Sequence, residues 1–169
     1  TEAYRYIVQL HHKPAVLVLS RQPLPTLDRK KYAPASGVAR GAYVLADAPG
    51  GDPEVILIAS GSEVSLAVAA HEKLIAEGVR SRVVSMPSWD IFEQQTQEYQ
   101  DSVLPPGVIA RVAVEQASTF GWERYIGKRG RMIGMKTFGA SAPLKELQKK
   151  FGFEPDQIVA AAKQLLTKK

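Results

Sequence analysis

Short, mostly continuous runs of apolar residues recur along the chain from residue 55 onward. They occupy Val55–Ala59 and residues 82–86, 108–114 and 132–135. Apolar residues at successive positions are typical of strands that are covered on both faces, as in a parallel sheet. Each run therefore predicts a buried strand.

The segment after the first run has the spacing of an α-helix. Ser60 and Glu63 are placed as a capping box at its start, and Gly78 is placed to end it. The apolar face of this predicted helix holds Val64, Ala67, Val68, His71, Leu74 and Ile75.

Further helices are predicted over residues 90–103, 120–126, 141–150 and 155–167. The first of these should break near Thr96, and the third should be capped by Ser141. The last opens at Pro155, a residue that the first helical turn accepts. Its apolar face holds Ile158, Val159, Ala162, Leu165 and Leu166.

Strands that alternate with helices at this spacing predict an α/β fold, because parallel neighbours need crossover connections. We expect three layers, α/β/α, around a mostly parallel sheet of about five strands. Residues 41–169 can form this unit alone, and they are predicted to be one domain.

Residues 1–40 have a different pattern. Residues 1–12 have helical spacing, and Ala15–Leu19 (AVLVL) predicts a further buried strand. Residues 20–40 contain several prolines and no sustained periodicity, which indicates a connecting segment. We expect residues 1–40 to be the tail of a preceding domain followed by a linker, and the chain to be a piece of a longer polypeptide.

Composition narrows the range of functions. The chain has 169 residues, a formal charge of +5 and no cysteine, which excludes disulfides and thiolate chemistry. The longest aliphatic runs are five residues, so no membrane span is expected. The one dense basic cluster is Lys128, Arg129, Arg131 and Lys136. No aromatic residue is interleaved there to stack on a base, which favours a solvated face over a nucleic-acid site.

The carboxyl ends of the strands are where an open α/β sheet gathers ligands. Amides of Ser62 and Glu63 could hold a small anion there, although a cap is the simpler interpretation. Glu63 and Glu115 could meet as a carboxylate pair, which the sequence alone cannot decide. The sequence contains no dinucleotide or P-loop glycine motif. We assign no catalytic, metal-binding or cofactor-binding residue.

The histidines do not predict a metal or catalytic site. His71 lies on the apolar face of its helix, which favours a core histidine with a satisfied ring over a ligand or base. His11 and His12 are adjacent, so they would point to different faces of a helix.

Arg21 is the one candidate binding residue. It follows the predicted strand at 15–19 directly, so it would stand at the carboxyl end of that strand. A guanidinium group there suits a phosphate, because its fork of donors matches anionic oxygens. An ordinary salt bridge between domains would explain the residue equally well.

Several motifs, taken in order, resemble the C-terminal part of a transketolase. They are residues 20–22 (SRQ), 41–45 (GAYVL), 59–64 (ASGSEV), 82–88 (RVVSMPS), 111–115 (RVAVE) and 138–143 (FGASAP). The stretch at 118–123 (STFGWE) is most similar to plant and cyanobacterial members. The ordered set covers nearly the whole chain and is specific, although no single motif is.

The resemblance implies that the chain holds the end of a pyrimidine-binding domain and all of the C-terminal domain. The parent enzyme would transfer a two-carbon ketol unit between sugar phosphates, in the pentose phosphate pathway or the Calvin cycle. It would use thiamine diphosphate with Mg²⁺ or Ca²⁺, bound upstream of Thr1, and form a homodimer in the cytoplasm or the plastid stroma. Arg21 matches the family arginine that binds the sugar phosphate.

Two other functions remain open at this point. One is a stand-alone, flavodoxin-like module that binds a small anion at residues 61–63. The other is a basic nucleic-acid-binding domain, which a steep dependence of affinity on salt would reveal.

Overall fold

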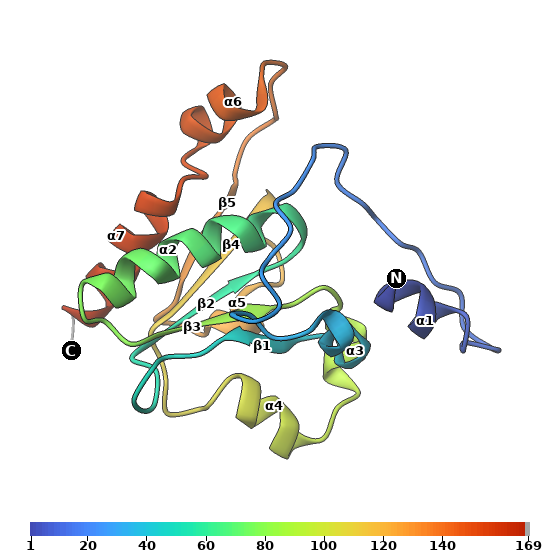
Figure 1. Cartoon of the computed structure of the whole chain (residues 1–169). Helices are drawn as coiled ribbons and strands as arrows, with labels where there is room; N and C mark the ends of the chain where they lie inside the picture. Colours follow the sequence, from blue (N-terminus) through green and yellow to red (C-terminus); the bar gives the residue numbers. More distant parts are fainter. Residues whose placement is uncertain (168–169) are drawn as a thin grey trace.

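A computed structural model describes residues 1–167 of the chain (Figure 1). Its strands are β1 (Tyr43–Ala46), β2 (Val55–Ala59), β3 (Ser81–Ser85), β4 (Arg111–Ser118) and β5 (Arg131–Met135). Its α-helices are α1 (Glu2–Ile7), α2 (Val64–Ala76), α3 (Trp89–Glu93), α4 (Gln97–Val103), α5 (Glu123–Ile126), α6 (Leu144–Phe151) and α7 (Pro155–Leu166). Two 3₁₀ helices, η1 (Ala35–Arg40) and η2 (Gly61–Glu63), complete the elements.

The five strands form one sheet in the order β1-β3-β2-β4-β5. Strands β3, β2, β4 and β5 are parallel to one another, and Leu57 on β2 lies between Val83 and Val112. Strand β1 runs antiparallel to β3, and its first residue, Tyr43, pairs with Ser85. After β3 the chain passes over β2 to form β4, which places a topological switch point between the carboxyl ends of β2 and β4.

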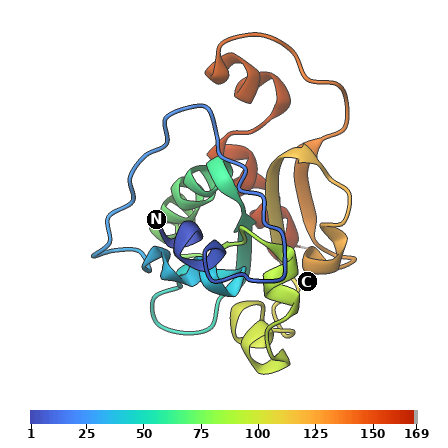
Figure 2. The same cartoon turned by 90° about the vertical axis from the view of Figure 1, so that its right-hand side faces the viewer.

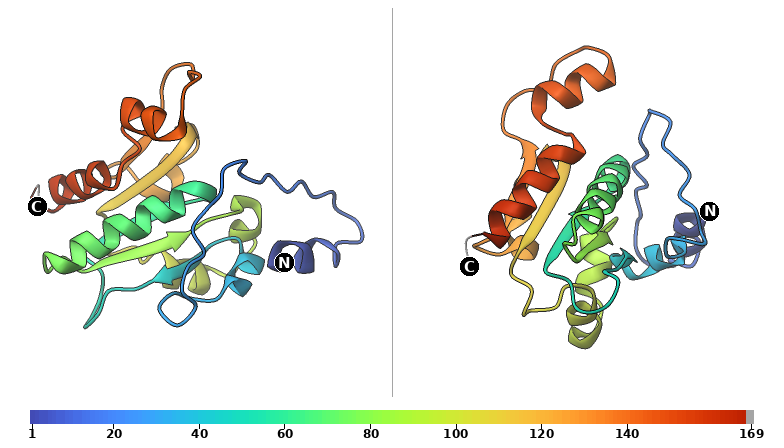
Figure 3. Two further views of the ribbon diagram at one scale, coloured as in Figure 1. Left: turned by 45° about the horizontal axis from the view of Figure 1, so that its top comes forward. Right: turned by 60° about the vertical axis from the view of Figure 1, so that its left-hand side comes forward.

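Helices cover both faces of the sheet, which confirms the predicted three layers. Helices α2 and α7 pack side by side on one face (Figure 3), over a core that includes Leu57, Leu74 and Ile158. Helices α3, α4 and α5 cover the other face, where Phe92, Val103, Trp122 and Tyr125 belong to one buried cluster with Ile58. Alternate residues of β2 therefore enter different cores, and all five residues are buried.

The helices form largely where the apolar spacing predicts them. The helical stretch at 90–103 is broken as expected, and the Thr96 hydroxyl accepts a hydrogen bond from the Tyr99 amide at the start of α4. The predicted face of α7 is correct, although Leu165 and Leu166 are only half-buried. The predicted cap at Ser141 is wrong, because α6 begins after Pro143 and no side chain caps it.

The capping box at the start of α2 is also wrong. A 3₁₀ turn, η2, precedes the helix, and neither Ser60 nor Glu63 makes a side-chain cap. Both side chains instead bind partners at the end of β4. The competing hydrogen bonds across the sheet edge explain why the local motif fails here.

The predicted strand at Ala15–Leu19 does not form. Residues 8–34 contain no helix or strand, and Val16 and Val18 are each 87% exposed. Figure 2 shows this segment as a long loop on the outside of the sheet unit. A strand needs a partner for its backbone groups, and within residues 1–167 no strand lies beside this segment. Its apolar side chains therefore stay uncovered.

Residues 28–40 pack onto the sheet unit, more closely than a linker would. Tyr32 is buried in the core with Leu45, and the Ala33 amide donates to the Leu45 carbonyl. Gly41 then turns the chain into β1 with a φ of 80°. A Cβ at Gly41 would lie 2.2 Å from the Phe92 nitrogen, so only glycine fits this turn. The boundary at residue 41 stays a prediction, and residues 168–169 of the predicted domain lie outside the described residues.

Candidate functional site

Arg21 lies on the open segment between α1 and η1. Its side chain is exposed, and within residues 1–167 it has no hydrogen bond or ion pair. The strand that was expected to hold its backbone is absent, so the residues of this chain do not enclose a phosphate around it. Its predicted role therefore depends on groups outside the described residues.

The carboxyl edge of the sheet brings together side chains from two strand ends. Ser60 follows β2 and donates its hydroxyl to Oε2 of Glu115 on β4. Glu63 in η2 accepts two hydrogen bonds from Gln116, from the amide nitrogen at 3.3 Å and from Nε2 at 2.6 Å, and one from the Ser62 hydroxyl. The Glu63 and Glu115 carboxyl groups, a pair that the sequence left open, lie close enough for Glu63 to act on the charge of Glu115.

The environment of Glu115 favours its protonated form. Burial and the neighbouring Glu63 outweigh the opposing effect of the Ser60 hydroxyl, and together they raise the pKa of this carboxyl to about 7. Burial penalises the charged form, and a like charge does the same. Glu115 thus keeps its proton at pH values where an ordinary glutamate has released it.

This arrangement does not favour the stand-alone anion-binding module. The side chain of Glu63 is 3% exposed and fills the edge where an anion would approach. Its carboxylate would repel a phosphate, and of the two amides proposed to hold an anion, that of Glu63 already donates to the Ser60 carbonyl.

His71 lies as the core interpretation predicts, whereas His11 and His12 are exposed. His71 is buried, its Nδ1 lies 2.8 Å from the Ser81 hydroxyl, and burial lowers its pKa. His11 and His12 have ring centres 6.4 Å apart. Across residues 1–167, no group of three or more His, Cys, Asp or Glu side chains could hold a metal ion. No helix in this range is long and apolar enough to cross a bilayer.

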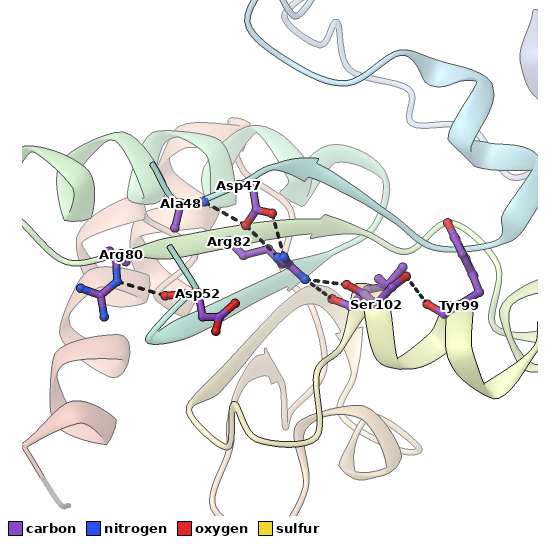
Figure 4. A network of polar contacts seen from close by, with 8 residues as sticks. Asp47, Ala48, Asp52, Arg80, Arg82, Tyr99 and Ser102 are labelled. Atoms are coloured by element: carbon purple, nitrogen blue, oxygen red, sulfur yellow. Dashed lines mark hydrogen bonds and ion pairs between the residues drawn. The ribbon is translucent and has the colours of Figure 1, made fainter. Parts of the chain in front are cut away.

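Sequence reasoning missed a buried arginine network (Figure 4). Arg82 on β3 binds Asp47 through two hydrogen bonds and donates from Nη1 to the carbonyls of Ser102 and Val103. Similarly, Arg111 donates to four backbone carbonyls around the ends of α4 and α5. The sequence did contain a signal for these two arginines, because each is a charged residue near the start of an otherwise apolar strand. Both arginines connect elements of this chain and are satisfied within it.

Sequence reasoning also missed Gln116. Its amide and side chain are the groups that fix Glu63 against β4. No pattern in the sequence marks a glutamine at a strand end for this role.

The fold and its edge define a three-layer α/β domain with one antiparallel strand and a carboxyl edge closed by its own side chains. Residues 41–154 match the family model of the transketolase-like TK C-terminal domain. The chain is 52% identical over 164 residues to transketolase 1 of Escherichia coli, covering 97% of this chain and 24% of that protein. The chain therefore belongs to the transketolase family and matches the C-terminal part of its members.

Other relatives agree with this assignment. Chloroplastic transketolase of Solanum tuberosum is 45% identical over 164 residues, covering 96% of this chain and 22% of that protein. These identities do not set plant members apart from the bacterial one. A crystal structure of a Pichia stipitis transketolase complex with sedoheptulose-7-phosphate has a TM-score of 0.86 at 36% identity, covering 98% of this chain and 23% of that chain. The chain spans about a quarter of the length of the relatives it matches.

Proposed function

We propose that this chain is the C-terminal domain, with the end of the preceding domain, of a transketolase that transfers a two-carbon ketol unit between sugar phosphates. The observation that carries the proposal is 47–52% identity to bacterial transketolases over 97–98% of the chain. The pathway would be the pentose phosphate pathway or the Calvin cycle, in the cytoplasm or the plastid stroma. A chloroplastic relative supports the second compartment.

In this proposal the chain has a structural role between domains. The exposed apolar side chains support it, because a stable surface rarely leaves so many uncovered. They are Val16, Val18 and Leu19 on the open segment, and Phe120 and Phe138 beyond the ends of β4 and β5. The upstream domains of the same polypeptide, and a second subunit of a homodimer, are the proposed partners.

Thiamine diphosphate and Mg²⁺ or Ca²⁺ would be bound upstream of this chain. The carboxyl groups at the sheet edge do not suit a diphosphate, and the described residues offer no cluster of metal ligands. When bound, the cofactor would supply the carbanion chemistry of ketol transfer. Arg21 is the residue of this chain that we propose binds the sugar phosphate, once the upstream domains enclose it.

A chimera tests the proposal. The last quarter of E. coli transketolase is replaced by this chain, and ketol transfer from a ketose phosphate to an aldose phosphate is measured with thiamine diphosphate and Mg²⁺. We expect an active enzyme, and a folded chimera that binds the cofactor but transfers nothing would contradict the proposal. The 169-residue chain alone should give no saturable heat with cofactor and Mg²⁺ in calorimetry, whereas a micromolar Kd would refute the upstream placement.

A further inference from the structure

Glu63 and Glu115 connect two elements that are distant in sequence. Glu63 lies in η2, the turn that leads from β2 into α2, and Glu115 lies near the end of β4, across the topological switch point. Ser60 donates to Glu115, and Gln116 donates to Glu63, so within residues 1–167 every side-chain hydrogen bond between residues 60–63 and β4 involves one of the two carboxyl groups.

No basic group compensates this pair among the described residues. The groups that act on the Glu115 carboxyl are the Ser60 hydroxyl and Glu63. The charged side chains of the elements packed against β4 are Arg131 on β5, Glu123 and Arg124 on α5, and Asp156 and Lys163 on α7. Strand β2 and η2 carry no charge besides Glu63, and Lys136 after β5 is exposed.

These surrounding charges are engaged elsewhere or lie at the other end of the sheet. Arg124 pairs with Glu93 at 2.6 Å, and Lys163 pairs with Glu77. Arg131 lies beside Val112, at the opposite end of β4 from Glu115. His71 on α2 hydrogen-bonds with Ser81 at the start of β3. Two carboxylates in this position would therefore face each other without a counter-ion.

We propose that Glu63 and Glu115 share one proton and form a pH-controlled latch between the turn after β2 and the end of β4. With the proton in place, the two carboxyl groups and their donors hold the turn against the strand. Loss of the proton leaves two negative charges at the switch point, and the turn separates from the strand.

The direction of the pH effect follows from proton binding. The folded chain holds this proton at pH values where the unfolded chain has released it. The stability that the latch contributes is thus fully present below the ordinary glutamate pKa and is lost as pH rises towards and through about 7. His71, whose folded pKa is lowered, acts in the opposite sense in part of this range, so differences between variants are the informative quantity.

The first experiment follows glutamate side-chain carboxyl carbons by NMR between pH 4 and 9 in the 169-residue chain. We expect one titration near pH 7 that disappears in Glu115→Gln and moves to lower pH in Glu63→Gln. Glu123→Gln, an exposed glutamate on α5, is the matched control and should leave that titration unchanged. If every glutamate of the wild-type chain titrates below pH 5.5, the shared proton does not exist.

The second experiment measures hydrogen exchange at the Gln116 amide, which donates to Glu63. After correction for the intrinsic rate, we expect protection to fall by about tenfold between pH 6 and 8.5 in the wild type and to stay constant in Glu115→Gln. Should Glu115→Gln not fold, the wild-type titration and exchange profile still decide. A carboxyl that titrates near pH 7 with no change in Gln116 protection would overturn the latch.

Discussion

Arg82 and Asp47 are joined by two parallel hydrogen bonds, from Nε to Oδ1 at 2.8 Å and from Nη2 to Oδ2 at 2.7 Å (Figure 4). The third nitrogen, Nη1, donates to the carbonyls of Ser102 and Val103 at the end of α4. One guanidinium group therefore connects the loop after β1, the buried strand β3 and the helix that covers the sheet. The Arg82 side chain is 11% exposed, so this connection lies largely out of water.

Replacing Arg82 should destabilise the fold. Arg82→Met keeps most of the volume but leaves Asp47 and two carbonyls without their donor, which should lower the free energy of unfolding by about 1.5 to 3 kcal/mol. Arg124→Met is the control, because the pair of Arg124 with Glu93 is exposed and should contribute less than about 1 kcal/mol. Urea unfolding measures the free energy of unfolding of both variants. Equal losses in the two variants would contradict the argument that burial makes the contacts of Arg82 stronger than those of Arg124.

The same pair should give an acid-dependent contribution. Burial acts to raise the pKa of Asp47, but the hydrogen bonds from Arg82 and the Ala48 amide outweigh it, and the pKa lies below its ordinary value. The contribution is present above the unfolded pKa of an aspartate and is lost as pH falls through the lower folded value. The difference in Tm between wild type and Arg82→Met should therefore shrink between pH 5 and pH 2. A difference in Tm that stays constant over this range would contradict a stabilising contribution from the ionised Asp47 carboxylate.

Helix α7 should depend on Ile158 more than on Leu165. Ile158 is fully buried in the core with Leu57 and Leu74, so Ile158→Ala should cost about 2 to 5 kcal/mol by leaving a cavity. Leu165 is half-buried, and Leu165→Ala should cost clearly less. Urea midpoints of the two variants decide this, and the reverse order would mean that the end of α7 packs more tightly than the structure shows.

Limited proteolysis should cut first within residues 11–27. This segment is exposed and has no helix or strand, whereas residues 28–40 pack through Tyr32 and η1. Exposed segments without secondary structure are the usual sites of nicking. Trypsin should cleave after Arg21, since Lys13 is followed by Pro14 and resists the protease, and should leave a stable product, identified by mass. Early cleavage within residues 55–160 would contradict this description.

The role proposed for Arg21 needs the full-length parent enzyme. A charge-assisted hydrogen bond contributes about 1.5 to 3 kcal/mol, so Arg21→Ala should lower kcat/KM for phosphorylated sugars by roughly ten- to a hundredfold. A phosphate far from the reacting carbonyl is held alike in ground and transition states, so the loss should appear mainly in KM. Unphosphorylated analogues should be nearly unaffected.

A matched control for Arg21 lies in the same segment. Arg29 is also exposed and donates to the Ala33 carbonyl, and Arg29→Ala should leave kcat/KM unchanged. Equal losses on phosphorylated and unphosphorylated substrates in Arg21→Ala would mean that Arg21 holds domains together instead of binding the substrate.

The fold could be predicted from the sequence where local spacing and burial agree. The apolar run of β2 and the apolar face of α2 carry their own signals, because each residue contributes to a core on a fixed side of its element. The segment at 15–19 has an equally clear strand pattern and forms no strand. The pattern indicates a segment that forms a strand when a neighbouring strand is present to pair with it. Within residues 1–167 no strand pairs with this segment.

The site was less predictable, because its contacts cross the sheet. Ser60 and Glu63 fit a capping box by spacing, yet their side chains bind residues more than fifty positions away. No local pattern reveals that competition. The meeting of Glu63 and Glu115 was foreseeable only as one possibility of the topology, and the part played by Gln116 was not foreseeable.

The reversed direction of β1 has a consequence for what this domain can do. Because β1 is antiparallel, residues 35–42 enter the sheet at the edge where the four parallel strands end, and Gly41 packs directly against Ser88 and Phe92 there. Most open α/β sheets leave that edge free for a ligand. Here the antiparallel strand β1 brings residues 35–42 to this edge of the sheet. The backbone of residues 35–42 therefore takes up part of the edge at which other sheets of this kind bind a ligand.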